Sequence, residues 1–358
     1  MRKVRFGLIG YGKVAHQHAQ AIKNSQYGTL VAVCGRNADR RDDFAAKWQL
    51  SSRRDVAEMV SLDQIDAVVV VTPHPQHHEH TLMAIGAGCH VLVEKPMALT
   101  EVECNEMIQA ATETNKVLSV VSQRRWHPPS QRIRKAIDQG QLGTPAIVSA
   151  TALGWRGEDY YASDPWRGSW EGEGGGVCIN QAPHLFDLIH WYMGPVSRIY
   201  SEWDNVNHPY IEVEDTAVAT IRFASGGMGS ILVSNSQDPG IHENLHVHGA
   251  NGASVGIKTD GGARATSGQI LTSQPSLNDL WTIRGEEGLL SGFQEQDIAQ
   301  FKRIDPNTYY FTCQIDDFAE SIIDGRPPLV TGKDGRETVR IIEGIYRSGR
   351  TSLPVSYS

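Results

Sequence analysis

The sequence predicts a two-domain protein in which a doubly wound parallel α/β sheet is followed by an α+β domain with a large, open, mostly antiparallel sheet. Its 358 residues are more than one hydrophobic core usually serves, which favours two domains. Short apolar runs alternate with helical stretches in the first third, and strands of alternating polarity occur later in the chain. We place the domain boundary after residue 123, giving domains of residues 1–123 and 124–358.

The first domain is predicted from a series of short strands rich in β-branched residues. Helical patterns separate them, including residues 14–24 and 42–48. Strands joined by crossover helices form a parallel sheet, and such a sheet binds ligands at the carboxyl ends of its strands. The expected strands cover residues 4–9, 30–34, 65–71, 91–93 and 117–121.

A glycine turn follows the first strand, with Gly10 and Gly12 one residue apart and the small residue Ala15 three positions further on. In such a turn the first glycine permits a tight bend, the second lets the backbone approach a pyrophosphate, and the third small residue lets helix pack on strand. Free N–H groups of the helix that begins near Lys13 and Val14 would complete a phosphate site. A dinucleotide site is therefore expected; a glycine turn without a ligand is the alternative.

The end of the second strand bears on which dinucleotide binds. An NAD site usually has Asp or Glu there to bind the ribose 2′-hydroxyl, but this chain has Cys34, Gly35, Arg36 and Asn37. Because Arg36 would suit a 2′-phosphate, we expect NADP rather than NAD. The alternative is that Arg36 is a solvated loop residue and that Asn37 caps the next helix.

The second domain is predicted from apolar and polar alternation between turns rich in Gly, Asn and Asp. His246 and His248 alternate along one of these strands, where a structural role is favoured over a ligand role. An open sheet with long edges is usually covered by self-association, so we expect a homodimer or homotetramer formed through this sheet. The expected strands cover residues 146–152, 198–203, 217–223, 227–233 and 245–248.

Composition argues against several classes of protein. A formal net charge of −8 and the lack of long Lys/Arg runs argue against nucleic-acid binding. No apolar run reaches the roughly 18 residues of a membrane helix, and the first residues lack the pattern of a signal peptide. The five cysteines are scattered without CxxC spacing, which fits a reducing cytoplasm and predicts no disulfide or zinc framework.

Two further strand ends carry unusual polar residues. Thr72 and Pro73 follow the third expected strand, with His77 in a cluster of histidines. No cysteine or HExxH spacing completes a metal site there, so we expect no metal. Glu94 and Lys95 close the fourth strand. A desolvated lysine at that place would suit proton transfer or carbonyl polarisation, whereas a surface lysine at the start of a loop is the alternative.

The motifs that carry a family resemblance are the glycine turn at residues 10–15, Thr72-Pro73 with His77, Glu94-Lys95-Pro96, the glycine run at residues 174–176 with Asn180, His184 and Asp187, and the ending at residues 327–336. Together they resemble the Gfo/Idh/MocA family, the glucose–fructose oxidoreductase and inositol dehydrogenase group of pyridine-nucleotide enzymes. The resemblance covers nearly the whole chain. It implies a Rossmann domain followed by a substrate-binding domain, and it implies that Lys95 is catalytic. Within the family, the chain is most similar to enzymes that oxidise glucosides or anhydrosugars.

Asn180, His184 and Asp187 are spaced to share one face of a helix. The family pattern has Asp at the position of Asn180 and implies that His184 and Lys95 handle the proton. An amide cannot accept a proton at neutral pH, so Asn180 is expected to orient a substrate hydroxyl. As alternatives, Asn180 caps the helix and His184 is a core histidine. Asp187 either orients His184 or joins a polar network.

Residues 155–176 are rich in aromatic and charged side chains and end in three glycines. Rings that stack on C–H faces, beside polar groups that bind hydroxyls, suit a sugar; a structural loop is the alternative. The glycines are expected to bring the loop close to the nicotinamide and to lead into the helix of His184. The expected substrate contacts are Lys95, Arg125, Trp126, Trp155, Tyr160, Tyr161, Asn180 and His184.

These observations predict an NAD(P)-dependent oxidoreductase that transfers a hydride between nicotinamide and a secondary hydroxyl of a sugar, glycoside or cyclic polyol. The alternatives are a reductase of an anhydroketose or diketone-type carbonyl, and a non-catalytic NADPH-binding regulatory protein. Gln123, Arg125 and Trp126 follow the fifth strand, where they either contact nicotinamide and substrate or serve as hinge residues. The expected cofactor contacts are Gly10, Gly12, Lys13, Val14, Ala15, Arg36, Thr72, Pro73, His77, Glu94, Lys95, Gln123, Trp166 and Arg167.

Overall fold

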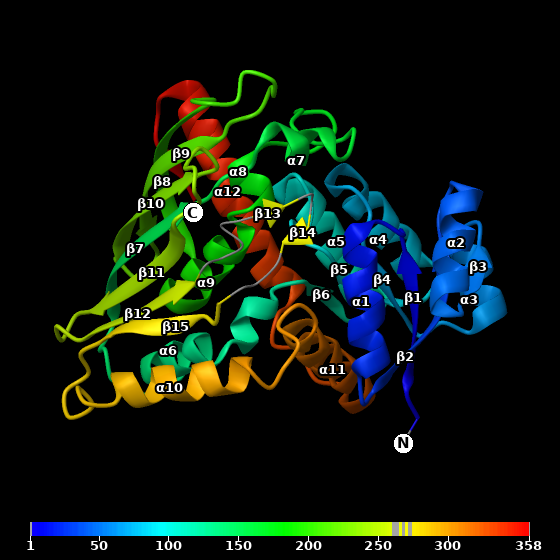
Figure 1. The fold of residues 1–358 in the computed structure, drawn as a ribbon, viewed down its shortest axis with the longest axis horizontal. Helices are drawn as coiled ribbons and strands as arrows, with labels where there is room; N and C mark the ends of the chain where they lie inside the picture. The colour runs from blue at the N-terminus through cyan, green and yellow to red at the C-terminus, as the bar shows by residue number, and fades with distance from the viewer. Residues whose placement is uncertain (1, 260–264, 267–268, 271–273, 358) are drawn as a thin grey trace. The chain divides into compact units, whose positions relative to one another are not determined.

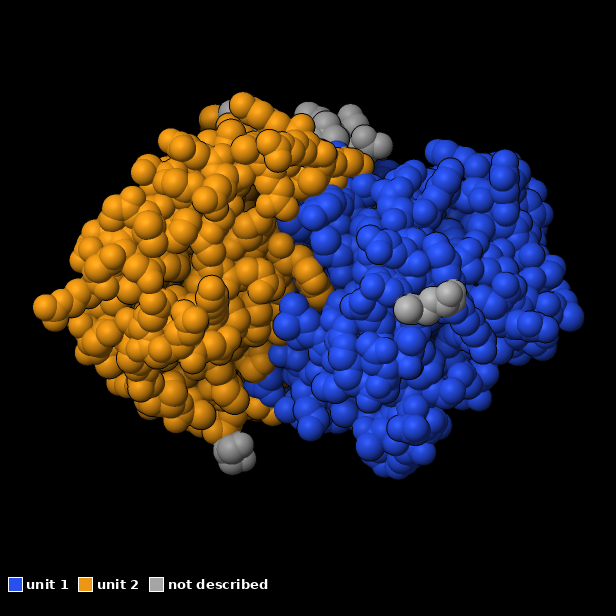
Figure 2. Space-filling view, turned by 90° about the horizontal axis from the view of Figure 1, so that it is seen from below, with its two compact units in different colours: residues 1–123, 307–339 blue, residues 124–306, 340–358 orange. Residues whose placement is uncertain are grey.

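The structure is a computed structural model that describes residues 2–259, 265–266, 269–270 and 274–357. The chain forms two compact units, coloured separately in Figure 2. Unit 1 comprises residues 1–123 and 307–339, and unit 2 comprises residues 124–306 and 340–358. Each unit has its own sheet and its own core.

Unit 1 is built on a six-stranded sheet with the order β3-β2-β1-β4-β5-β6 (Figure 1). All neighbouring strands pair in parallel. The predicted doubly wound α/β fold is confirmed, although the short edge strand β3 was not among the expected strands. The strands are β1 (Val4–Ile9), β2 (Gly28–Cys34), β3 (Ser51–Arg53), β4 (Ala67–Val70), β5 (His90–Val93) and β6 (Leu118–Val120).

The helices of unit 1 follow the strands in alternation, as the periodicity predicted. Asn37 caps α2, because its side-chain oxygen accepts a hydrogen bond from the N–H of Arg40 at 3.0 Å. Thr100 and Glu103 form a capping box at the start of α5. The helices are α1 (Lys13–Asn24), α2 (Ala38–Trp48), α3 (Val56–Asp63), the 3-10 turn η1 (His74–Gln76), α4 (His77–Gly86), α5 (Glu101–Glu113) and α11 (Tyr309–Asp324).

Helix α11 belongs to unit 1 although it lies late in the chain. Phe318 is fully buried, and its ring centroid lies 6.1 Å from that of Phe6 in β1. Gln314 accepts a hydrogen bond from the N–H of Ser122 at 2.9 Å and donates one to the carbonyl of Val120 at 2.7 Å. These bonds satisfy the backbone at the end of β6. Residues 307–339 therefore extend unit 1, whereas the sequence analysis assigned everything after residue 123 to the second domain.

Unit 2 is built on an eight-stranded sheet with the order β15-β12-β11-β7-β10-β9-β8-β16. Its neighbouring strands are antiparallel except for β7 and β10, which pair in parallel. The predicted large, mostly antiparallel sheet is confirmed. The strands are β7 (Pro145–Leu153), β8 (Val196–Asp204), β9 (Thr216–Phe223), β10 (Met228–Ser234), β11 (His242–Gly249), β12 (Ser254–Thr259), β15 (Leu277–Trp281) and β16 (Val355–Ser356), with β13 (Ala265–Thr266) and β14 (Gln269–Ile270) as a separate pair.

Helices α6, α8 and α9 pack against this sheet, and Figure 1 shows α8 and α9 along one side of it. Burial alternates along the strands, so that Ala217, Ala219 and Ile221 of β9 are buried while the residues between them are exposed. None of the helices in the described part of the chain is long and apolar enough to cross a membrane. The helices are η2 (Gln123–Trp126), α6 (Pro128–Asp138), α7 (Glu158–Ala162), α8 (Val177–Asn180), α9 (Pro183–Met193), α10 (Leu290–Phe301) and α12 (Gly332–Thr351), the last of which begins in unit 1.

Candidate active site

The glycine turn of unit 1 leaves open space in front of helix α1. Gly10 has a φ of 111°, and a Cβ there would lie 2.9 Å from the carbonyl oxygen of Val71, so this position requires glycine. A Cβ on Gly12 would meet no atom within 4 Å. Gly12 is also the N-cap of α1 and has no side chain to bond the first N–H groups of the helix. The turn therefore offers backbone donors to an anion, as a pyrophosphate site requires.

The first residues of α1 divide between solvent and core. Lys13 is exposed, whereas Val14 packs against the hydrophobic core of unit 1 and Ala15 is fully buried. The small side chain of Ala15 lets the helix lie close to the sheet, which is the role that the fingerprint predicted for it. Lys13 and the helix N-terminus together give this edge positive charge.

The loop after β2 presents a cation and no carboxylate. Arg36 is exposed, and the backbone N–H of Asn37 donates to the hydroxyl of Tyr11 at 2.9 Å. The side chain of Asn37 caps α2, as one sequence interpretation proposed. The pKa of His80 in α4 is lowered mainly by burial, with a contribution from the charge of Arg36.

The His77 ring connects the loops that follow β4 and β5. It is fully buried, with Nδ1 at 2.7 Å from the carbonyl oxygen of Pro96 and Nε2 at 2.8 Å from that of Thr72. Burial lowers its pKa, which favours the neutral ring. Pro73 and Thr72 are partly buried, and the Thr72 hydroxyl lies 3.0 Å from Nδ1 of His80. The geometry gives His77 a role in holding the loops that carry Thr72 and Pro96.

Glu94 and Lys95 are held at the end of β5. One carboxylate oxygen of Glu94 lies 2.8 Å from Nε2 of His18, and the other accepts the N–H of Lys95 at 3.0 Å. Burial alone would raise the pKa of Glu94, but the bond and charge of His18, together with Lys95, hold it below its usual value. Lys95 is partly buried, and its peptide bond to Pro96 is cis. His18 of α1 was not among the predicted site residues, because it lies 76 residues before Glu94 in the chain.

Gln123 offers a further polar atom at the end of β6. Its side-chain oxygen is buried and has no hydrogen-bond partner among the described residues. A buried acceptor without a donor costs free energy, so a ligand that brings an N–H group would be stabilised there. The amide group of a nicotinamide is such a donor, which agrees with the expected cofactor contact at Gln123.

In unit 2, the helix that carries His184 begins later than the sequence suggested. Helix α9 starts at Pro183, with Ala182 as its N-cap, and Asn180 is the last residue of the separate short helix α8. The alternative in which Asn180 caps the helix of His184 is therefore wrong. Two residues separate the helices, so Asn180 and His184 also do not share one regular helical face. His184 is partly buried in the first turn of α9.

Arg125 and Asp187 form a buried, two-pronged ion pair. Arg125 Nε lies 2.9 Å from Asp187 Oδ2, and its Nη2 lies 2.7 Å from Oδ1. The two side chains are 1% and 2% exposed, and the guanidinium lies 5.1 Å from the ring centroid of Trp191. This pair joins η2 to α9 and gives Arg125 a framework role in unit 2; Trp126 beside it is partly buried. Of the two sequence interpretations for Asp187, the geometry favours a polar network over orientation of His184.

Asn180 belongs to a polar network that the sequence did not reveal. Its amide nitrogen donates to the hydroxyl of Tyr160 at 3.1 Å and to the carboxylate of Glu173. The Tyr160 hydroxyl also accepts hydrogen bonds from the amide nitrogen of Gln181 at 3.0 Å and from Nη1 of Arg167 at 2.5 Å. Tyr160 and Glu173 are 4% and 1% exposed, so this network lies inside unit 2.

Several aromatic side chains of residues 155–176 are buried or partly buried, although exposed rings would be needed for stacking on a sugar. Tyr161 is 8% exposed, with its ring 5.2 Å from that of Tyr160, while Trp155 is partly buried. The guanidinium of Arg167 contacts two rings, 4.2 Å from the centroid of Tyr160 and 4.4 Å from that of Trp166. These contacts order the segment; contact with substrate or cofactor stays a prediction for its members.

The glycine run at residues 174–176 packs against unit 2 itself. A Cβ on Gly175, which has a φ of 153°, would lie 2.0 Å from the hydroxyl of Tyr346, and a Cβ on Gly176 would lie 1.8 Å from the carbonyl oxygen of Glu214. The carboxylate of Glu214 accepts N–H bonds from Gly176 at 2.9 Å and Cys178 at 3.0 Å. The glycines therefore make room for a tightly packed loop that leads to α8.

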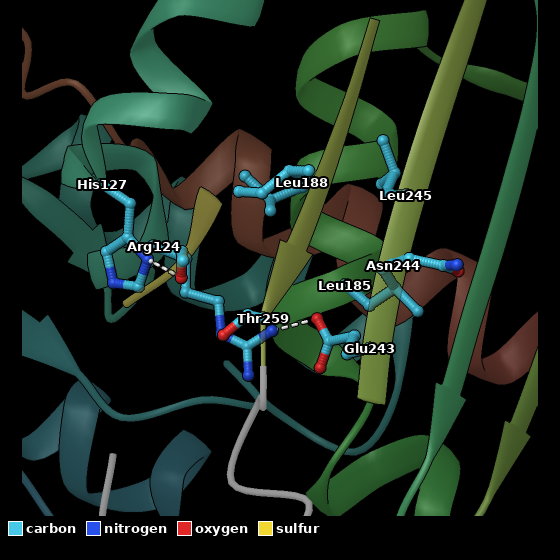
Figure 3. A pocket seen from close by; sticks show the side chains of 10 residues that line it. Arg124, His127, Leu185, Leu188, Glu243, Asn244, Leu245 and Thr259 are labelled. Atoms are coloured by element: carbon cyan, nitrogen blue, oxygen red, sulfur yellow. Dashed lines mark hydrogen bonds and ion pairs between the residues drawn. The ribbon is translucent and has the colours of Figure 1, made fainter. Parts of the chain in front are cut away.

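A small pocket lies beside α9 in unit 2 (Figure 3). Figure 3 shows Arg124 and Glu243 pointing toward each other, and the two form an ion pair. His127 lines the pocket with its Nδ1 2.9 Å from the hydroxyl of Ser276, and burial, helped by Arg124, lowers its pKa to about 3. Leu185, the neighbour of His184, lines the same pocket. Among the described residues, no group of three or more His, Cys, Asp or Glu is placed to hold a metal ion.

Comparison with known proteins matches both parts of the chain to one family. Residues 4–122 match the oxidoreductase family with an NAD-binding Rossmann fold, and residues 130–255 match the GFO/IDH/MocA C-terminal domain. The chain belongs to the Gfo/Idh/MocA family. The resemblance predicted from its motifs is confirmed, and this Gfo/Idh/MocA protein is an NAD(P)-binding oxidoreductase.

Three similar proteins define the neighbourhood within the family. D-glucoside 3-dehydrogenase of Escherichia coli is 31% identical over 248 residues, which is 63% of this chain and 68% of that protein. The NADP⁺-dependent scyllo-inositol 2-dehydrogenase of Bacillus subtilis is 26% identical, covering 97% of this chain and 94% of its own length. The solved structure of the WlbA dehydrogenase from Bordetella pertussis, in complex with NADH and UDP-GlcNAcA, is 27% identical with a TM-score of 0.83, covering 100% and 99% of the two chains.

Proposed function

We propose that this protein is a dehydrogenase that oxidises a secondary hydroxyl of a sugar, glycoside or cyclic polyol. The observation that carries the proposal is the combination of an open phosphate turn at Gly12 with a buried, hydrogen-bonded Glu94 that positions Lys95. The relatives support the substrate class, because they include a glucoside dehydrogenase and an inositol dehydrogenase.

The cofactor would be held mainly by unit 1. Backbone N–H groups at Gly12 and the start of α1 would bind the pyrophosphate, and Gln123 would accept the nicotinamide amide. Trp166 and Arg167, whose side chains are stacked on each other, are proposed as further contacts from unit 2. When bound, the nicotinamide supplies the carbon that accepts the hydride.

Proton transfer would depend on Lys95 and His184. His184 would accept the hydroxyl proton as the carbon loses its hydride, and the ammonium of Lys95 would donate a hydrogen bond to the oxygen that becomes a carbonyl. Glu94 keeps the backbone of Lys95 in place and is itself fixed by His18. Asn180 would hold a neighbouring hydroxyl of the substrate, since an amide binds hydroxyls but does not take protons at neutral pH.

Purified protein assayed with NAD⁺ and NADP⁺ against sugars, glycosides and inositols tests the proposal. We expect turnover with at least one of these substrates, and Lys95→Ala and His184→Ala should each lower kcat by roughly 100-fold or more, while cofactor affinity is retained. Lys23→Ala, which changes an exposed lysine in α1, is the matched control and should keep full activity.

Two other outcomes would replace the proposal. Turnover only in the reverse direction, with an anhydroketose or diketone, would make the protein a reductase that uses the same site. Cofactor binding without turnover on any substrate would favour a regulatory NADPH-binding protein. Full activity of both Lys95→Ala and His184→Ala would contradict the proposed roles of these residues.

We also propose NADP as the preferred cofactor, on the ground that the loop after β2 has an exposed Arg36 and no carboxylate. A guanidinium bound to the 2′-phosphate contributes roughly 1.5–3 kcal/mol, or about 10- to 100-fold in affinity. Arg36→Ala should therefore raise KM for NADP⁺ by that factor and leave KM for NAD⁺ nearly unchanged. Equal effects on both cofactors, or a wild-type preference for NAD⁺, would contradict this preference.

Self-association through the sheet of unit 2 is proposed as well. Val218, Leu232, Met228, Ile147 and Tyr200 are each at least 36% exposed. The pairs Val218–Leu232 and Met228–Ile147 are cross-strand partners, so these side chains lie on one outward face. Apolar side chains gathered in this way are usually covered by a partner, here a second copy of the chain.

Light scattering coupled to gel filtration tests this assembly. The wild type should form a dimer or tetramer, and Val218→Glu should shift it to smaller species, because a charge would be buried in the interface. The exposed residue Val102 of α5 supplies a control, since Val102→Glu should not alter the mass. A monomeric wild type would contradict the proposal.

A further inference from the structure

Glu173 is a buried carboxylate that lies outside the residues assigned to the reaction so far. It is 1% exposed, and its Oε2 accepts the N–H of Gly168 at 2.7 Å. The backbone N–H of Glu173 in turn donates to the carbonyl of Ser169 at 3.0 Å. The bond from Gly168 therefore holds one carboxylate oxygen, and the guanidinium of Arg167 lies 3.9 Å from the other, Oε1, before Asn180 is considered.

The Asn180 amide is oriented by what surrounds it. A carboxylate oxygen accepts hydrogen bonds, so the Asn180 atom that faces Glu173 must be the NH₂ group and not the carbonyl oxygen. The same NH₂ group has its second hydrogen directed to the hydroxyl of Tyr160, at 3.1 Å. With both hydrogens directed into the network, the amide presents its oxygen on the opposite side. A turned amide would place two oxygens against each other.

We propose that Glu173 is a positioning residue, which locks the Asn180 amide so that its carbonyl oxygen accepts a hydrogen bond from a substrate hydroxyl. This inference rests on the proposed function and deepens it. It explains how an amide serves at a position where the family pattern has an acid: the negative charge is kept, but on the neighbouring Glu173. Glu173 acts through Asn180 and does not itself meet the substrate.

The arrangement makes a prediction for charge exchange between the two positions. Asn180→Asp alone would bring two carboxylates into contact, and two such groups share one proton until the pH is high enough to remove it. Arg167, whose Nη1 lies 3.9 Å from Glu173 Oε1, is the cation that faces this pair and offsets part of their repulsion. The double variant Glu173→Gln/Asn180→Asp restores one carboxylate and one amide in reversed order, so the contact is again a hydrogen bond. Glu173→Gln alone places two amides together and permits Asn180 to turn.

The four proteins, wild type, Glu173→Gln, Asn180→Asp and the double variant, should be compared for kcat, KM and melting temperature between pH 5 and 9. Glu173→Gln should lower kcat/KM by up to roughly 100-fold, as expected when a substrate-binding group is misplaced. Asn180→Asp should lose activity and melting temperature relative to wild type as the pH rises. The double variant should regain the pH dependence of melting that the wild type shows.

The exposed Glu171, two residues before Glu173, provides the matched control, because Glu171→Gln makes the same chemical change without the buried contact. Glu173→Gln with the activity of Glu171→Gln, or Asn180→Asp with a wild-type pH profile, would overturn the inference. The melting curves need no substrate. A wild type without turnover would therefore refute the proposed function, while the pH dependence of Asn180→Asp would still test the contact between residues 173 and 180.

Discussion

At Gly12 in unit 1 a Cβ would meet no atom within 4 Å, whereas at Gly176 in unit 2 it would lie 1.8 Å from the carbonyl oxygen of Glu214. Both glycines belong to glycine-rich loops that lead into a helix. The first loop is open at the point where its helix begins, and the second is filled by the protein. One keeps space for a ligand, and the other uses the missing side chain to pack.

The difference gives the glycines of the second loop a packing role, whereas the closeness of this loop to the nicotinamide stays a prediction. Its glycines are required by Tyr346 and Glu214, whose atoms already occupy the space a Cβ would need. The loop still leads to Asn180, so its packing determines where that amide lies. Close packing and ligand binding therefore produce the same sequence signal, a run of glycines, through different physical causes.

The largest effect is expected from Gly176→Ala. Because the clash is with a backbone carbonyl, either the glycine loop or the segment of Glu214 just before β9 must shift. We expect a loss of about 3 kcal/mol in the free energy of unfolding, measured by urea denaturation. Gly292→Ala is the control, since a Cβ at this position in α10 would meet nothing within 4 Å. If Gly176→Ala were as stable as the control, the close packing proposed for the second loop would be contradicted.

The second expected effect concerns pH. Burial raises the pKa of Glu214 to about 7, although bonds from Cys178, Tyr346 and Gly176 lower it in part. Between about pH 4.5 and 7 the unfolded chain releases this proton while the folded protein retains it, so stability falls as the pH rises through this window. In Glu214→Gln this fall should be absent, a difference of about 3 kcal/mol between the two pH profiles. Parallel profiles of unfolding free energy would show that Glu214 does not titrate in this way.

The smallest effect on folding is expected from Gly12→Ala. Since its Cβ meets no protein atom, the free energy of unfolding should change by less than about 0.5 kcal/mol. The Kd for NADPH should rise by about tenfold, because the methyl group enters the space proposed for the pyrophosphate. Gly86→Ala, also free of contacts in unit 1, should alter neither quantity. Unchanged cofactor affinity in Gly12→Ala would mean that the open space is not the phosphate site.

Most of the fold followed from local patterns. The strands of unit 1 were predicted to within a few residues, since each is a short apolar run bounded by helices, and five strands of unit 2 were predicted from their alternation. The edge strand β3 has three partly buried residues and thus no pattern. Helix α11 was missed as a part of unit 1, because nothing in its own sequence tells which sheet Phe318 and Gln314 will meet.

Prediction of the site was less complete. The residue types at positions 10, 12 and 15 and at 94–95 indicate a site without knowledge of the fold, because a turn, a helix start and a strand end impose local requirements. The substrate contacts expected of Arg125 and Tyr160 stay predictions, but their protein partners were not foreseen: Arg125 pairs with Asp187, and Tyr160 lies within the Asn180 network. Glu171 and Glu173 are two residues apart, and no local rule tells which of them is buried.

The sequence by itself determined the two kinds of sheet, the dinucleotide turn and the family, because these depend on periodicity and on residues close together in the chain. Tertiary structure decided which polar side chains meet: His18 with Glu94, Arg125 with Asp187, and Glu173 with Asn180. A buried polar group must find a partner wherever the fold provides one, and that partner is usually distant in sequence. For this reason the amide at position 180 could be noticed in the sequence, but the carboxylate that orients it could be found only in the fold.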